Sequence, residues 1–206
     1  MPQRPSSGGN SHMAGGGRSA VSDLFASEHD RPLADQLRPA TLDEVIGQDH
    51  LLGPQGALRI MLDGGHLSSL ILWGPPGVGK TTIARLLADG SQMHFVQISA
   101  IFSGVAELRK LFDAAAARRR AGQGTLLFVD EIHRFNRAQQ DAFLPHMEDG
   151  TITLIGATTE NPSFELNNAL LSRAQVLVLN ALDDGALEAL LQRAETTLDA
   201  PLSLTP

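Results

Sequence analysis

Apolar and polar residues alternate in blocks along most of this chain, and the blocks have two different periods. Short, nearly continuous apolar runs are typical of β-strands that are covered on both faces. These runs predict five strands, at residues 69–73, 94–99, 125–130, 152–158 and 174–179. Apolar residues at helical spacing predict helices at residues 56–62, 80–88, 105–120, 137–147 and 183–198. Because strands and helices alternate, we predict an α/β fold with a five-stranded parallel sheet flanked by helices.

The two ends of the chain differ from this alternating core. Residues 1–30 are rich in Ser, Gly and Arg, lack hydrophobic periodicity and contain what resembles the remnant of a tag, so we expect a disordered tail. We predict a globular core at residues 31–180 and the beginning of a helical lid at residues 181–206, which we interpret as truncated. At the start of the core, Thr41 and Glu44 have the spacing of a capping box that closes the first turn of a short helix.

A glycine-rich loop connects the first predicted strand to the helix that follows it. The sequence from the loop into the helix is Gly74-Pro75-Pro76-Gly77-Val78-Gly79-Lys80-Thr81-Thr82. Glycines let backbone N–H groups turn toward phosphates, and the helix directs the positive end of its dipole at them. In a loop of this pattern Lys80 reaches the β- and γ-phosphates, and the Thr81 hydroxyl binds Mg²⁺. The alternative is a glycine-rich turn without a ligand, but the flanking strand and helix favour binding of ATP or ADP with Mg²⁺.

Two adjacent carboxylates, Asp130 and Glu131, follow the apolar run at residues 126–129. They should lie at the C-terminal edge of the sheet, where ligands of open α/β folds bind. There Asp130 would hold Mg²⁺ through water, and Glu131 would polarise the water that attacks the γ-phosphate. The alternative is an acidic strand end without a role. Because the pair suits activation of water, we predict an ATPase rather than a kinase.

Two further residues are candidates for catalysis. Thr158 ends the predicted strand at residues 152–158, where a hydroxyl can sense the γ-phosphate or hold the attacking water. Strand alternation leaves the choice between Thr158 and Thr159 open, and a plain strand-to-turn junction remains an alternative. Arg173 follows a short helical segment, and an isolated arginine is more often a solvated surface residue.

The composition excludes several other classes of site. The chain has no Cys, which excludes disulfides and thiolate metal sites, and its seven His lack the spacings of a transition-metal site. No apolar run approaches the ~18 residues of a membrane span, so we expect a cytoplasmic protein without a membrane anchor. The net charge of −7 argues against tight non-specific binding of nucleic acid by the chain as a whole.

Four motifs, in this order and spacing, resemble those of an AAA+ ATPase: GPPGVGKTT, FVDEIHRFN, GATTENP and LLSRA. Residues 130–136, 139–145 and 155–164 narrow the resemblance to the replication-associated recombination protein A family, also called MgsA, which includes the eukaryotic Werner-helicase-interacting ATPase. Residues 135–145 and 156–171 are far more specific for this resemblance than the phosphate loop. The resemblance extends from Pro32 to the end of the chain. It implies a P-loop NTPase core with the first part of a helical lid, and an ATPase of replication-fork maintenance, recombination and repair.

The resemblance also implies roles for individual residues. Arg173 would be an arginine finger that acts in trans, on ATP bound to the neighbouring subunit of a homo-oligomer. Ser99 stands where many clamp-loader subunits carry an Asn that restrains the catalytic Glu. Similarity to clamp-loader relatives implies an adenine pocket that includes Arg38, Pro39, Ile46, Gly47 and Gln48.

For the intact protein, the resemblance implies action on DNA forks, gaps and duplex ends near the nucleoid, with single-stranded DNA-binding protein as a partner. Family members oligomerise through a region that follows the lid. One alternative is a clamp-loader or branch-migration type of ATPase, which residues 135–145 disfavour. Another is a nucleotide-gated interaction platform, which would need neither Glu131 nor Arg173.

Overall fold

The structure of the chain is a computed structural model that describes residues 33–198. Helix α1 (Leu33–Gln36) belongs to a first unit that ends at Gln36, and the second unit, from Leu37 onward, contains the other elements. The expected disordered tail at residues 1–30 and the last part of the expected lid, residues 199–206, lie outside the described residues. None of the described helices is long and apolar enough to cross a membrane.

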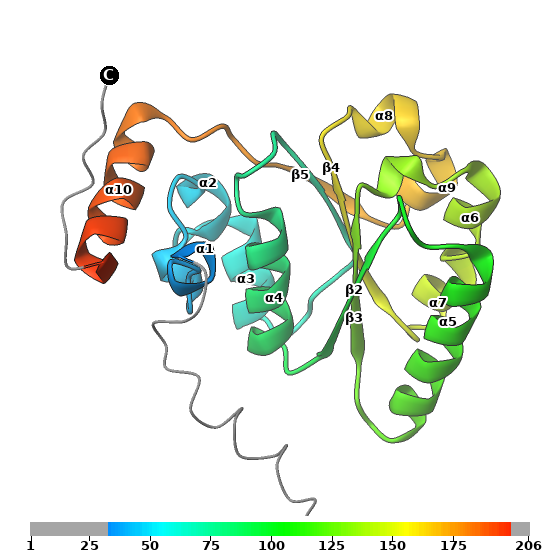
Figure 1. Cartoon of the computed structure of the whole chain (residues 1–206). Helices are drawn as coiled ribbons and strands as arrows, with labels where there is room; N and C mark the ends of the chain where they lie inside the picture. The colour runs from blue at the N-terminus through cyan, green and yellow to red at the C-terminus, as the bar shows by residue number, and fades with distance from the viewer. Residues whose placement is uncertain (1–32, 199–206) are drawn as a thin grey trace, which may run out of the picture. The chain divides into compact units, whose positions relative to one another are not determined.

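A five-stranded sheet forms the centre of the second unit (Figure 1). Its strands are β1 (Leu70–Trp73), β2 (His94–Ser99), β3 (Thr125–Asp130), β4 (Thr153–Thr158) and β5 (Gln175–Val178). They lie in the order β2-β3-β4-β1-β5, and each adjacent pair is parallel. The predicted α/β fold with a five-stranded parallel sheet is therefore confirmed.

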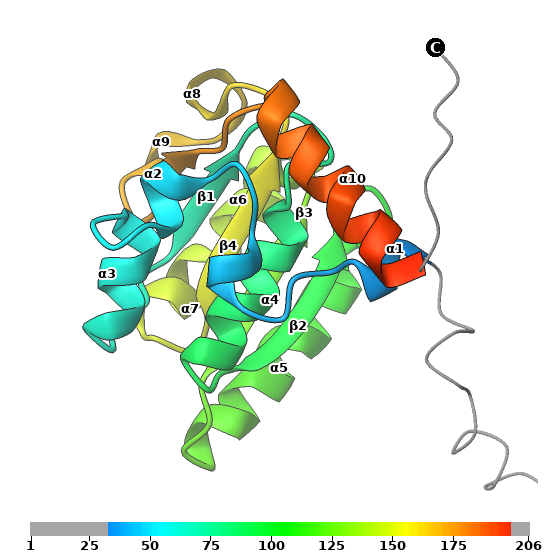
Figure 2. The ribbon, with the colours of Figure 1, turned by 90° about the vertical axis from the view of Figure 1, so that its left-hand side faces the viewer.

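Helices cover both faces of this sheet (Figure 1). One face carries α2 (Asp49–Leu52), α3 (Ala57–Asp63) and α4 (Lys80–Gly90), and the other carries α5 (Val105–Arg120), α6 (Arg137–Asp141) and α7 (Leu144–Glu148). The view in Figure 2 brings α2, α3 and the C-terminal helix α10 (Asp184–Leu198) to the front.

Two buried clusters lie on opposite faces of the sheet, and β1 contributes to both. Leu70 and Leu72 pack into one cluster with α4, whereas Ile71 packs into the other with α5. All three side chains are fully buried. This alternation is the two-residue period of a strand that is covered on both faces, and it explains why the run is apolar throughout.

The predicted helix at residues 137–147 is wrong in its continuity, because the structure has two short helices, α6 and α7, in its place. Pro145 accounts for the break. Proline has no N–H to donate to the carbonyl four residues earlier, and its ring displaces that carbonyl. The sequence pattern also missed α2 and the short helix α8 (Pro162–Glu165), whereas α9 (Asn168–Leu171) is the short helical segment expected before Arg173.

The capping box predicted at Thr41 and Glu44 does not have the expected bonds. The structure has a 3₁₀ turn, η2 (Leu42–Glu44), and the Thr41 hydroxyl makes no bond to a backbone N–H of that turn. It donates to Glu44 Oε1 at 3.1 Å, while Glu44 Oε2 accepts from the N–H of Ala40 at 3.2 Å. A capping box does form at α6, where Asn136 and Gln139 bond reciprocally.

Candidate nucleotide-hydrolysis site

The C-terminal ends of β1, β3 and β4 bring the main predicted site residues to one edge of the sheet. Trp73 at the end of β1 pairs in register with Thr158 at the end of β4, and Val129 of β3 pairs with Gly156 of β4. The glycine-rich loop follows β1, and the carboxylate pair is at the end of β3. The parallel register therefore places the loop, the acidic pair and the threonine at one edge, as the sequence predicted.

The glycine-rich loop at residues 74–79 is anchored at its first residue. The Gly74 N–H donates to the carbonyl of Thr158 at 3.2 Å, and a Cβ at Gly74 would lie 2.5 Å from the Leu179 carbonyl oxygen. Further along, Gly77 and Gly79 have φ angles of 80° and 95°, which favour glycine. Glycine is thus required at Gly74 because the backbone of Leu179 is close, and it is favoured at Gly77 and Gly79 because the backbone is left-handed there.

Lys80, the first residue of α4, is held beneath this loop. Its side chain points inward, since the residue is only 9% exposed, and its ammonium donates to the carbonyls of Gly74 and Pro75, each at 2.7 Å. Burial lowers the pKa of Lys80, and the negative charges of Glu131 and Asp130 partly offset this shift. The cation therefore lies within electrostatic range of both carboxylates, although they come from a different strand.

The donor set at this edge fits a hydrated Mg²⁺ ion beside a nucleotide phosphate. Magnesium prefers oxygen ligands, keeps several waters and commonly uses one or two protein groups together with phosphate oxygens. Thr81, in the first turn of α4, offers a hydroxyl, and Asp130 at the end of β3 offers a carboxylate. Helix α4 and strand β3 are in contact, which brings the elements that carry these two groups together.

Glu131 has a constrained position directly after β3. Its φ of 52° and ψ of 46° lie in the left-handed region, which costs a non-glycine residue about 1–2 kcal/mol. The residue precedes the 3₁₀ turn η3 (Ile132–Arg134). Its side chain is 27% exposed, and Oε2 lies 3.2 Å from Nδ1 of His133. The left-handed backbone therefore sets the direction in which the Cα–Cβ bond of Glu131 leaves the sheet edge.

Thr158 is fully buried, and its hydroxyl is engaged within the protein. Oγ1 accepts from the N–H of Glu160 at 3.0 Å, lies 3.2 Å from the carbonyl oxygen of Glu160, and lies 3.0 Å from Nδ1 of His133. Its role as a γ-phosphate sensor stays a prediction, as does the choice between it and the half-buried Thr159. Sequence reasoning missed His133, and the only signal was its place two residues after Glu131.

Two of the residues predicted for the adenine pocket, Gln48 and Gly47, lie close to the chain after β5. The Gln48 side chain exchanges two hydrogen bonds with the backbone of Asn180, at 2.9 and 3.0 Å, and is fully buried. Gly47 has a φ of 81°, and a Cβ there would lie 2.6 Å from Leu182 Cδ2. Pro39 and Ile46 are half-buried and Arg38 is exposed, and the adenine role of all five residues stays a prediction.

The chain just before Gln48 also contacts α10, through Glu44. Arg193 of α10 donates to the carboxylate and to the carbonyl of Glu44, at 2.6 and 3.2 Å. The pKa of the Glu44 carboxyl is lowered by the N–H of Ala40 and by Arg193. This pair ties the element predicted as the beginning of the lid to the core.

Arg173 lies at the opposite edge of the sheet from the glycine-rich loop. It precedes β5, whose first residue, Gln175, donates its N–H to the carbonyl of Ser69 at the start of β1. The strand then runs about 13 Å to the loop edge. The Arg173 guanidinium is 38% exposed and is held by Glu148 of α7, with Nε 2.6 Å from Glu148 Oε1. Arg173 is therefore not part of the site formed within its own chain.

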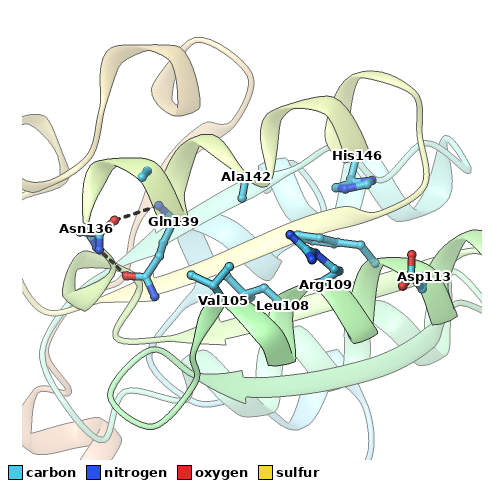
Figure 3. A pocket seen from close by; sticks show the side chains of 10 residues that line it. Val105, Leu108, Arg109, Asp113, Asn136, Gln139, Ala142 and His146 are labelled. Atoms are coloured by element: carbon cyan, nitrogen blue, oxygen red, sulfur yellow. Dashed lines mark hydrogen bonds between the residues drawn. The ribbon is translucent and has the colours of Figure 1, made fainter.

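A separate cavity of about 360 Å³ lies between α5 and the α6–α7 pair (Figure 3). Val105, Leu108 and Phe112 contribute its apolar wall on α5, and Gln139 and His146 border it from the other side. None of the residues that line it is a predicted nucleotide or catalytic residue. The cavity is thus distinct from the site at the sheet edge.

The chain belongs to the family described as "ATPase family associated with various cellular activities (AAA)", whose profile matches residues 70–182. It is 54% identical over 170 residues to Replication-associated recombination protein A of Haemophilus influenzae, an alignment that covers 82% of this chain and 38% of that protein. It is 46% identical to the ATPase WRNIP1 of Dictyostelium discoideum, over 82% of this chain and 19% of that protein.

Among solved structures, the RuvB Holliday junction branch migration motor of Thermotoga maritima superposes with a TM-score of 0.65 at 31% identity, covering 79% of this chain and 55% of that chain. These relatives confirm the resemblance that the motifs indicated and the nucleotide-binding ATPase fold. The chain spans about two fifths of the length of the replication-associated recombination proteins that it matches.

The close approach at Gly74 generates a prediction. In Gly74→Ala the new methyl group meets the backbone oxygen of Leu179, which cannot move without shifting β5. We expect the free energy of unfolding to fall by about 1–3 kcal/mol, the usual range for overpacking, and ATP to bind more weakly. Urea unfolding and ATP titration measure the two effects. Gly104→Ala is the matched control, since a Cβ there meets nothing within 4 Å, and equal losses in both variants would contradict the steric explanation.

Proposed function

We propose that this chain is the nucleotide-binding core of a Mg²⁺-dependent ATPase that acts on DNA in replication-fork maintenance, recombination and repair. The observation that supports the enzymatic part is the sheet edge shared by the glycine-rich loop with Lys80 and the Asp130–Glu131 pair. The similarity to replication-associated recombination proteins supports the DNA-directed part. Both parts are proposals for a full-length protein, because this chain spans only about two fifths of the length of these relatives.

In this proposal each group has a separate task. The loop N–H groups and the Lys80 ammonium bind the β- and γ-phosphates of ATP. Thr81, and Asp130 through water, would hold Mg²⁺, which would neutralise phosphate charge when bound. Glu131 accepts a proton from water as its oxygen attacks the γ-phosphorus, and the bond to the β–γ bridging oxygen breaks to release ADP and phosphate. Thr158 contacts the γ-phosphate.

We further propose that Arg173 completes the site of a neighbouring subunit. Its position at the edge opposite the loop excludes action on ATP bound to its own chain, whereas its exposure and its anchoring by Glu148 suit presentation to a second copy. A guanidinium in this role stabilises the charge that develops on the transferred phosphoryl group. The homo-oligomer is then required for turnover.

The proposed DNA substrates are forks, gaps and duplex ends, with single-stranded DNA-binding protein as a partner and a location in the cytoplasm at the nucleoid. Because the chain has a net charge of −7, DNA contacts would be local rather than spread over its surface. A nucleotide-gated interaction platform is the second candidate function. The constrained placement of Glu131 disfavours it, because a platform needs no base for water.

Glu131→Gln tests the enzymatic part of the proposal. The amide keeps the shape of the side chain but cannot accept a proton from water, so Mg-ATP binding should be preserved while turnover falls by about 10²-fold or more. Steady-state phosphate release and nucleotide titration on the full-length protein measure the two quantities. Unchanged turnover would remove Glu131 from the mechanism.

Mixed oligomers test the trans action of Arg173. Neither Arg173→Ala nor Lys80→Ala protein should hydrolyse ATP alone, because one lacks the finger and the other lacks the phosphate-binding lysine. When the two full-length variants are mixed, some interfaces combine an intact Lys80 with an intact Arg173, and ATPase activity should be partly restored. The controls are the two variants assayed separately at the same total protein concentration. No recovery in oligomers that are shown to have exchanged subunits would count against a trans finger.

A further inference from the structure

A single histidine nitrogen lies between two oxygens that the proposed mechanism uses. Nδ1 of His133 is 3.2 Å from Oε2 of Glu131 and 3.0 Å from Oγ1 of Thr158. The His133 side chain is 7% exposed, so water has little access to compete for these contacts. The three residues come from different elements, since His133 is in η3, Glu131 precedes that turn and Thr158 ends β4.

We propose that His133 is a positioning residue that couples the hydroxyl of Thr158 to the carboxylate of Glu131. This inference rests on the ATPase function proposed above. In it, the contact that Thr158 makes with the γ-phosphate is transmitted through Nδ1 and sets the Glu131 side chain in place for water activation.

The coupling follows from the hydrogen-bonding capacity of one nitrogen. In neutral imidazole Nδ1 is either a donor or an acceptor, never both. If Nδ1 is an acceptor, the Thr158 hydroxyl can donate to it. The Nδ1 lone pair then also faces the Glu131 carboxylate, which is unfavourable. If it is a donor, it can bond Glu131 Oε2 and hold the carboxylate. Which group accepts the proton of the Thr158 hydroxyl therefore determines whether the donor or the acceptor form of Nδ1 is favoured.

A γ-phosphate oxygen offers Thr158 a new acceptor. A hydroxyl has one proton, and two acceptors lie within its reach in the structure, Nδ1 of His133 at 3.0 Å and the carbonyl oxygen of Glu160 at 3.2 Å. When Thr158 donates that proton to phosphate, it donates to neither of them. The tautomer with the proton on Nδ1 can then donate a hydrogen bond to the carboxylate of Glu131. No hydrogen bond from Thr158 to Nδ1 is lost, because the Thr158 proton already bonds the phosphate. Occupation by ATP would thereby fix the base, whereas ADP, which lacks the γ-phosphate, would not.

Glu131 needs an external restraint of this kind. Its Oε2 is buried and has no well-formed hydrogen bond among the residues that the structure describes, so His133 is the partner that the geometry offers. Ser99, which the sequence suggested for this restraint, has its hydroxyl oxygen 3.4 Å from the N–H of Ile101 instead. In this proposal the restraint comes from the turn after β3, where Nδ1 of His133 lies 3.2 Å from Glu131 Oε2.

Three substitutions at His133 in the full-length protein test the proposal by their pattern. His133→Phe fills the space without a nitrogen, His133→Asn places an amide near the position of Nδ1, and His133→Gln places it near the position of Nε2. We expect kcat to fall at least 10-fold in His133→Phe and His133→Gln, with KM and the Kd of Mg-ATP within about 3-fold of the unaltered protein. His133→Asn should recover a large part of the lost kcat. Equal kcat in all three variants and the unaltered protein would overturn the proposal, as would equal losses in all three.

His146→Phe is the matched control for removing a histidine ring. His146 stacks on Phe112 with the ring centroids 4.1 Å apart, far from the sheet edge in the wall of the α5–α7 cavity. This substitution keeps the stacking and should leave kcat unchanged. A loss of kcat as large as in His133→Phe would show that packing, not the Nδ1 contact, explains the effect.

A spectroscopic measurement keeps the proposal testable if a His133 variant fails to fold. In the intact protein with ¹⁵N-labelled histidines, the His133 signal is assigned by its loss in His133→Asn. Addition of the non-hydrolysable analogue AMP-PNP with Mg²⁺ should move Nδ1 toward the protonated chemical shift, whereas ADP with Mg²⁺ should not. Thr158→Val should abolish the difference between the two nucleotides. The same Nδ1 shift with both nucleotides would overturn the coupling.

The two levels of the proposal can fail separately. If Glu131→Gln hydrolyses ATP normally, the proposed function fails and the coupling fails with it. If Glu131→Gln loses turnover but His133→Phe retains it, only the role of His133 fails.

Discussion

The parallel pairing of β3, β4 and β1 is the constraint on which the candidate site depends. Each strand ends at the same edge, and the loop after β1 is fastened to the end of β4 by the bond from Gly74 to the Thr158 carbonyl. A shift of one residue in this register would turn the side chain of Thr158 to the other face of the sheet. The position of the loop and the position of the threonine are therefore set by the same contact.

The elements that surround this edge have a second function, which is to limit how the catalytic groups can move. The Lys80 ammonium is held by two loop carbonyls, and the left-handed backbone of Glu131 sets the direction of its Cα–Cβ bond but not the position of its carboxylate. In the proposed coupling, the adjustable contact among these groups is Nδ1 of His133, which either accepts from Thr158 or donates to Glu131. In the proposed mechanism, held phosphate-binding groups with one adjustable contact at the base would let the site respond differently to ATP and ADP.

Much of the fold was predictable, because buried parallel strands have a distinct sequence pattern. The predicted bounds of β2, β3 and α5 agree with the structure, since apolar runs and turn residues mark them clearly. The break at Pro145 was missed because apolar spacing continues across it. The partners of Gln48 and Glu44 are Asn180 and Arg193, more than 100 residues away, and no local pattern reports such contacts. His133 was missed for the same reason, since its importance lies in a tertiary contact with Thr158.

The most direct test is steady-state ATP turnover by the full-length protein without DNA and with single-stranded, blunt duplex, gapped and forked DNA. If the sheet edge belongs to a DNA-directed ATPase, turnover should rise with ends, gaps or forks and should depend on Mg²⁺. Slow turnover that is the same with every DNA, in oligomers that bind ATP tightly, would contradict that function and favour a nucleotide-gated interaction platform.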